Sequence, residues 1–258
     1  MQKRTSVQWH DLLHLTRGEV VAELLISLPW LLGSLVLASL QAYALALACS
    51  FMFFLTGLRQ VHNAFHFALG IRKFQTHCVM VLLSALMLGS MHAVQVNHLR
   101  HHRHCLGRDD VEAMSARMAW WQAIAIGPVF PVILHVSALR ACTPNQRFLI
   151  IAELSANVAV LALVFLVLDF TSLQYHFYAM AIGQCLTAFF AVWTVHHGST
   201  ESRPVNRTMR SWLLGDLTYN MFLHAEHHLF PAVPTRKLPE LARRLDSVEP
   251  GLFRHRVL

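Results

Sequence analysis

Tyr219-Asn-Met-Phe-Leu-His-Ala-Glu-His-His-Leu-Phe-Pro-Ala-Val-Pro234 is the stretch that decides how this chain must fold. It contains His224, His227 and His228 at positions i, i+3 and i+4, so a helix would carry all three rings on one face. Neutral imidazoles that converge in this way are good ligands for transition metals. The stretch therefore predicts a metal site, and further ligands must come from other parts of the chain.

Three more histidine clusters lie upstream, and each of them follows an apolar stretch. They are His62 and His66; His98, His101 and His102; and His196 and His197. Together the clusters offer more ligands than the four that a tetrahedral zinc ion takes, and they are enough for two ions. A histidine-rich pair of redox-active metals at a membrane face indicates iron and oxygen chemistry.

The composition is typical of an integral membrane protein. Of the 258 residues 55% are hydrophobic and 14% are charged, and the mean hydropathy is +0.44. The net charge of +7 comes from bases scattered between apolar runs, so we expect no nucleic-acid binding. The five cysteines are spread singly without a C-x-x-C pair, and we expect reduced thiols rather than a disulfide framework.

Four apolar segments approach the roughly 20 residues that cross a bilayer core. They are 24–40, 42–58, 148–168 and 175–195. A short turn joins the first segment to the second, and another joins the third to the fourth. We predict an all-α integral membrane protein with four transmembrane helices in two hairpins, interfacial helices and a histidine-rich cytoplasmic cap. The single domain would comprise an N-terminal segment 1–23, a membrane region 24–195 and a C-terminal segment 196–258.

Two further apolar segments have no clear path through the membrane. If 76–96 crossed fully, His62 and His98 would lie on opposite faces, so either this segment is shallow or re-entrant or the clusters do not meet. The segment 119–139 contains Pro128 and Pro131, which indicate an interfacial or broken helix rather than a straight crossing.

The basic residues indicate the sidedness. Bases such as Arg59, Arg72 and Arg147 fall on the same side as the histidine clusters, while the two hairpin turns contain neither Lys nor Arg. By the positive-inside rule the histidine side is cytoplasmic. We expect an integral protein of a bacterial inner membrane, with the histidines and both termini in the cytoplasm.

Three motifs resemble the histidine boxes of the membrane-bound fatty acid desaturase superfamily, which also contains hydroxylases and carotenoid ketolases. They are His62-Asn-Ala-Phe-His66, His98-Leu-Arg-His101-His102 and His224-Ala-Glu-His227-His228. Together with Asn206-Arg-Thr-Met209 and Leu238-Pro-Glu-Leu241, the third motif is similar to a bacterial branch that includes the rhizobitoxine-pathway desaturase. The resemblance runs from about residue 60 to residue 241 in the family's order.

The resemblance implies a non-haem centre of two Fe²⁺ ions, with O₂ as co-substrate and the histidines of the three boxes as ligands. The family often adds a ligand after the fourth transmembrane helix, which here falls on either His196 or His197. Residues that would position ligands or a ligand water are Asn63, Asp109, Asp110, Glu112 and Asn220. Asn63 stands where many desaturases have Asp.

The resemblance also implies the partners and the reaction. A lipid or acyl substrate would lose two hydrogens, and an external electron donor such as a ferredoxin, a rubredoxin or a cytochrome b5-like protein with its reductase would dock. Histidine spacing does not separate a desaturase from a hydroxylase or ketolase. A zinc membrane hydrolase needs a His-Glu-x-x-His pair, which Glu226 does not form, and a metal transporter would distribute its ligands through the bilayer.

Overall fold

The first hairpin is formed by α1 (Arg17–Leu25), α2 (Leu28–Ser39) and α3 (Tyr43–Phe65). A computed structural model of the protein describes residues 7–107, 109–198, 206–248 and 257, and every element in that part of the chain is helical. Parts of the predicted segments 1–23 and 196–258 therefore lie outside the described residues. The helix α3 continues beyond the predicted end at residue 58, because its polar side chains Arg59 and Asn63 are buried and bonded.

The second hairpin is formed by α8 (Pro144–Ala162) with its π-helical extension η3 (Leu163–Leu168), and by α9 (Thr171–Cys185), π-helical η4 (Ala188–Trp193) and α10 (Thr194–His196). Three stretches are individually long and apolar enough to cross a membrane, namely Arg17–Ser39, Tyr43–Phe65 and Pro144–Leu168. The fourth crossing is α9 to α10, which bends by 41°. The predicted two hairpins are confirmed, and Glu153 of α8 is buried.

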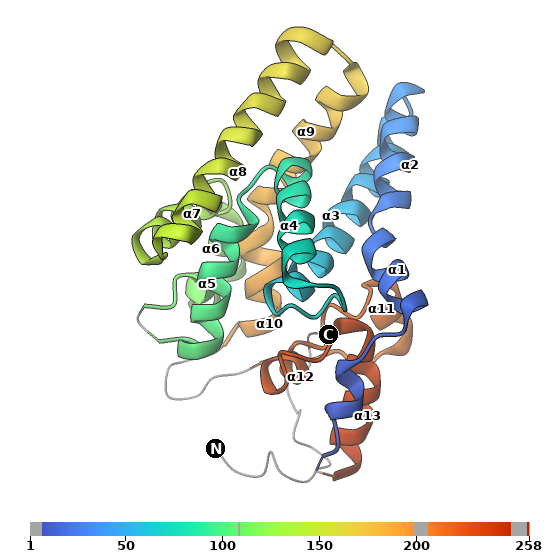
Figure 1. The fold of residues 1–258 in the computed structure, drawn as a ribbon, viewed down its shortest axis with the longest axis vertical. Helices are drawn as coiled ribbons and strands as arrows, with labels where there is room; N and C mark the ends of the chain where they lie inside the picture. Colours follow the sequence, from blue (N-terminus) through green and yellow to red (C-terminus); the bar gives the residue numbers. More distant parts are fainter. Residues whose placement is uncertain (1–6, 108, 199–205, 249–256, 258) are drawn as a thin grey trace.

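Between the hairpins, α4 (Lys73–Met87) and α5 (Met91–His104) bend by 111° at Leu88, which has a left-handed φ of 57°. The Nε2 atoms of His66, before α4, and His98, in α5, lie 3.0 Å apart. Both ends of this pair of helices are therefore on one side, and the pair is re-entrant. Figure 1 shows α4 rising beside α3 and α5 returning toward the histidine side.

The segment after α5 consists of the 3₁₀ helix η2 (Glu112–Arg117) and two short helices, α6 (Trp120–Ala125) and α7 (Phe130–Ala141). The break between α6 and α7 confirms the expectation of a broken helix. The Trp120 and Trp121 side chains are 58% and 57% exposed, as an interfacial position requires. At the break, Gly127 approaches the backbone of Cys185 so closely that a Cβ would lie 1.8 Å from the Cys185 carbonyl oxygen.

A cap covers the histidine side of the hairpins and lies opposite their turns (Figure 1). It contains η1 (His10–Leu13), α11 (Trp212–Leu217), α12 (His224–Leu229), η5 (Thr235–Lys237) and α13 (Leu238–Val248). Leu12, Phe230 and Leu241 belong to its apolar core, and Arg244 pairs with Asp11 at 2.8 Å across it.

Buried polar contacts fasten this cap to the membrane helices. Glu23 of α1 is fully buried and accepts from Arg59 of α3 at 2.5 Å and from Arg236 of η5 at 2.9 Å. The Oδ1 atom of Asn63 accepts from the backbone N–H and the hydroxyl of Thr235, at 3.0 and 2.8 Å. Because losing one partner of a buried ion pair costs about 3–5 kcal/mol, these contacts hold the cap in one position.

Candidate metal centre

The structure brings nine of the predicted histidines together in two adjacent groups. The donor nitrogens within each group lie within 4.8 Å of one another. The first histidine group contains His62, His66, His98, His102 and His227, and the second histidine group contains His101, His196, His224 and His228. The His102 and His228 rings stack with centroids 4.4 Å apart and so join the two groups.

The helices α5 and α12 each contribute to both groups. On α5, His98 and His102 face the first group while His101 faces the second; on α12, His224 and His228 face the second group while His227 faces the first. Positions i and i+4 lie close together around a helix, but i+3 is about 100° away from i+4. The i, i+3, i+4 spacing therefore divides its three rings between two sites, where the sequence alone predicted one shared face.

The nitrogen contacts suit a metal better than they suit hydrogen bonding. In the second group, Nε2 of His224 lies 2.8 Å from Nε2 of His196 and 2.9 Å from Nε2 of His228. In the first group, Nε2 of His227 lies 2.9 Å from Nε2 of His102. One proton can serve only one such contact, so several lone pairs face each other. A cation within each group would remove that repulsion.

Carboxylates fix the ring orientation on α5. The Nδ1–H of His101 donates to Asp110 at 2.7 Å, and the Nδ1–H of His98 donates to Glu112 at 2.8 Å. A ring that donates from Nδ1 has its lone pair on Nε2, the atom that points into the group. Asp110 is itself held by the backbone N–H groups of Leu106 and Ala113, at 2.7 and 3.1 Å.

The pKa values of the α12 histidines favour neutral imidazoles. Burial, followed by the neighbouring imidazoles, holds the pKa of His224, His227 and His228 well below the ordinary histidine value. Burial opposes ionisation of Asp110, but the hydrogen bond and charge of His101 together with the backbone N–H groups of Leu106 and Ala113 outweigh it, and the pKa of this carboxyl group is lowered. Burial raises the pKa of Glu112 to about 7. At neutral pH the imidazoles of α12 therefore keep their lone pairs free for a metal.

Unlike Asp110 and Glu112, four of the predicted site residues neither belong to the two groups nor bond one of their rings in the contacts described below. The His197 ring stacks on Trp193 with centroids 4.1 Å apart, and its Nδ1 bonds the Trp193 carbonyl oxygen at 3.0 Å. Asp109 is exposed, and Asn63 bonds Glu23 and Thr235 rather than a histidine. Asn220 lies in the turn after α11, at a left-handed φ of 60°.

One supporting residue was missed by sequence reasoning. Glu226 lies inside the third motif, is fully buried and accepts from the Thr208 hydroxyl at 2.7 Å while pairing with Arg210. These contacts bind α12 to the segment before α11 and so fix the direction of its histidines. The sequence offered one signal for this role: Glu226 is an acidic residue between two histidines of the third motif. Its partner Thr208 belongs to the Asn206-Arg-Thr-Met209 motif upstream.

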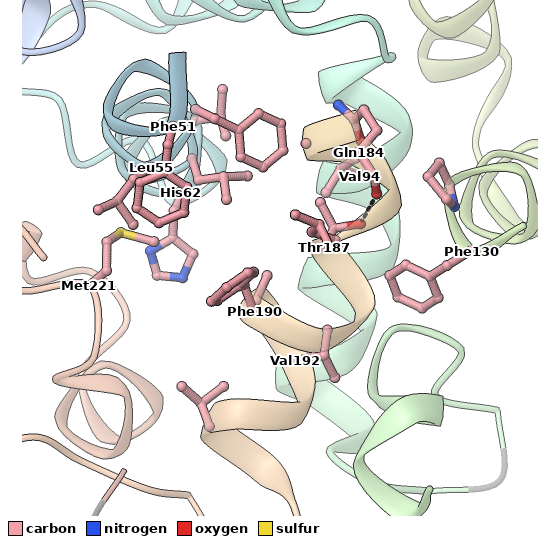
Figure 2. Close-up of a pocket in the computed structure, with 18 of the residues that line it drawn as sticks. Phe51, Leu55, His62, Val94, Phe130, Gln184, Thr187, Phe190, Val192 and Met221 are labelled. Atoms are coloured by element: carbon pink, nitrogen blue, oxygen red, sulfur yellow. Dashed lines mark hydrogen bonds between the residues drawn. The ribbon is translucent and has the colours of Figure 1, made fainter. Parts of the chain in front are cut away.

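An apolar cavity of about 540 Å³ ends at both histidine groups. His62 and His98 of the first group and His224 of the second line its end. Its walls come from α3, α5, α7 and the α9–η4 segment, and Figure 2 shows Phe51, Phe130 and Phe190 around the space with His62 at its edge. The volume is within the range of about 300–1,000 Å³ that small-molecule sites occupy.

The comparison with family models gives one match. The model described as fatty acid desaturase matches residues 38–255, which include all nine histidines of the two groups. No curated protein matches the chain.

Proposed function

The chain belongs to the fatty acid desaturase family, and from that membership we propose that it is an oxygen-dependent di-iron oxidoreductase that introduces a double bond into an acyl chain. Membership of the family implies a membrane oxidoreductase. The iron, the oxygen and the acyl chain are what we propose in addition. This proposal rests on the two groups of histidines at the end of an apolar cavity.

The donor set supports two ions. The first histidine group would hold one iron with up to five imidazoles and the second would hold the other with four. Imidazole suits iron, and nine ligands exceed what one ion can take. When bound, the two ferrous ions would supply the reduction of O₂ and the oxidation of an unactivated C–H bond.

The chain's own residues would position that chemistry. Asp110 and Glu112 hold the His101 and His98 rings so that Nε2 faces the metal. The apolar walls would exclude water and keep the acyl chain extended past His62 and His98. A substrate carbon at that end of the cavity would face both groups, since His224 also lines it.

The reaction needs electrons from outside. We propose that a ferredoxin, a rubredoxin or a cytochrome b5-like protein with its reductase docks on the histidine side, which would face the cytoplasm of a bacterial inner membrane. The partly exposed Arg100 and the exposed Arg103 of α5 lie on this side, next to the metal-binding histidines of the same helix. A positive surface there would attract an acidic donor.

Metal analysis tests the proposal. Detergent-purified protein should contain about two irons per chain, as a two-metal site requires. His227→Ala removes a ligand of the first group and His101→Ala removes one of the second, so each variant should lose iron. Cells or vesicles with a reducing system should then form an alkene from an acyl chain under O₂, and neither variant should do so.

The outcomes separate the alternatives. Stoichiometric zinc in the purified protein, or iron that survives both substitutions, would refute the di-iron oxidoreductase and reopen the hydrolase and transporter hypotheses. An alcohol or a ketone in place of the alkene would keep the iron centre but make the protein a hydroxylase or ketolase.

A further inference from the structure

One wall of the cavity is a single layer of side chains. Leu47 and Phe51 of α3, Ile182 of α9 and Phe190 of η4 all line the cavity. The same side chains are 53%, 48%, 58% and 39% exposed. These side chains therefore mark the side on which the cavity lies nearest to the surroundings of the protein.

The opposite wall is closed. Phe130 and Leu134 of α7 and Met91 of α5 also line the cavity, but they are only 1%, 6% and 3% exposed. They are packed behind by other helices, so a molecule reaches them only through the cavity. The cavity is therefore close to the protein surface on the side of α3 and η4 and is covered by other helices on the side of α5 and α7.

Two aromatic rings close the thin wall. Phe51 of α3 and Phe190 of η4 meet edge to face with centroids 6.0 Å apart. Phe190 belongs to a π-helical segment, a backbone form that is frequent at functional sites. A rotamer change of either ring would connect the cavity to the outside without moving a helix.

In a bilayer this wall would face hydrocarbon. The wall belongs to the Tyr43–Phe65 crossing and to the bent α9–α10 crossing. Among the described residues that line the cavity none is Lys or Arg, and only Glu112 and histidines can carry a charge. A water-soluble acyl carrier with phosphate groups would need basic residues at the entrance. The entrance instead suits a hydrocarbon chain whose headgroup remains at the membrane surface.

We propose that the acyl chain of a bilayer phospholipid enters this cavity sideways, between α3 and η4, past the Phe51–Phe190 pair. The reaction of this lipid rests on the proposed function. The test of its entry does not, because it needs no reaction. It makes the substrate an intact membrane lipid rather than a thioester delivered from water.

Photolabelling without metal tests the entrance. The metal-free protein is placed in phosphatidylcholine nanodiscs that contain a trace of phosphatidylcholine with a diazirine in one acyl chain. Illumination and residue-level mass spectrometry should place the label on Met91 and Leu134, which are buried from the bilayer. In a parallel sample the same diazirine chain is supplied as its coenzyme A thioester, and these residues should carry little label.

Matched variants identify the route. The pair Phe51→Trp and Phe190→Trp should lower labelling of Met91 and Leu134 severalfold, whereas Phe51→Ala with Phe190→Ala should raise it. Leu45→Trp is the control, because Leu45 is 62% exposed on the same helix and does not line the cavity. Label on lipid-facing Leu166, which is 82% exposed, should stay constant in every folded variant.

Two results would overturn the inference. One is label at Met91 and Leu134 from the thioester but not from the phospholipid. The other is phospholipid label that neither pair of substitutions changes. Because labelling needs no iron, electrons or turnover, a protein that admits the lipid but lacks iron would refute the proposed function and leave the entrance intact.

Discussion

His196 and His197 are neighbours, but only His196 reaches a histidine group, because consecutive helical side chains point about 100° apart. Replacing His196 with Ala should remove a ligand of the second group and lower the iron content. Replacing His197 with Ala should leave the iron content unchanged. Elemental analysis of both purified variants checks this, and equal loss of iron in the two would contradict the assignment.

Asp110 and Asp109 form a second matched pair. Asp110→Asn removes the negative charge and one of the two acceptor oxygens that serve His101, Leu106 and Ala113, so the His101 ring is held less well and iron affinity should fall by roughly 10–100-fold, as is usual for partners that orient metal-binding histidines. Asp109→Asn changes an exposed side chain and should have little effect. Iron retention during dialysis against a graded chelator measures both, and an unchanged Asp110→Asn variant would exclude this role.

At the residue scale the sequence predicted that histidines form the site, and nine of the ten histidines it named lie in the two groups. It could not predict how His98, His101 and His102 divide, because the division depends on where α5 meets α10 and α12. It placed Asp109, Asp110 and Glu112 together as candidate acceptors, and only the contacts with His101 and His98 in the structure show that Asp110 and Glu112 face inward. The role of these residues as metal ligands or their partners stays a prediction.

At the scale of the elements, the break between α6 and α7 depends on a close backbone approach. An alanine at Gly127 would place its Cβ 1.8 Å from the Cys185 carbonyl oxygen, which is backbone and cannot move aside. Gly127→Ala should therefore lower the stability by about 1–3 kcal/mol or more.

Gly18 provides the control for this substitution. Nothing lies within 4 Å of a Cβ added there, so Gly18→Ala in α1 should be neutral or stabilise by about 0.4–1 kcal/mol. Thermal unfolding in detergent compares the two variants. A Gly127→Ala protein as stable as the Gly18→Ala protein would show that α6 and α9 separate easily.

Hydropathy predicted the two hairpins because four apolar runs of sufficient length leave few arrangements. It left 76–96 undecided, because length and composition do not reveal the 111° bend at Leu88. Hydropathy also did not predict that α3 extends to Phe65. Its last turns are polar, and they are stabilised by Glu23, which is distant in the sequence.

At the scale of the whole molecule, the metal-free protein should be sensitive to acid. Folding keeps the pKa of His224, His227 and His228 well below the ordinary value, so the unfolded chain binds protons first as the pH falls below about 6.5. Stability is then lost on acidification, by about 1.4 kcal/mol per pH unit for each such histidine.

Thermal midpoints between pH 7.5 and pH 5 measure this effect, at roughly one value per half unit across the range in which histidine titrates. His227→Gln should flatten the dependence, while His14→Gln, at an exposed position, should not. A metal-free protein whose midpoint is constant over this range would show that the imidazoles are not held neutral by the fold.

The membrane orientation is a further prediction at this scale. In a protein without its native cysteines, Gln41→Cys at a hairpin turn should react with an impermeant maleimide added outside intact spheroplasts. Arg103→Cys, exposed on the histidine side, should react only after lysis. The reverse pattern would place the histidine groups outside the cytoplasm.

Both histidine groups depend on α12, since it supplies His227 to one and His224 with His228 to the other. During synthesis α12 leaves the ribosome after all the other contributing segments, so neither group is complete on a nascent chain that already has its hairpins in the bilayer. Metal binding by both groups, as proposed, would therefore have to follow insertion of the hairpins into the membrane.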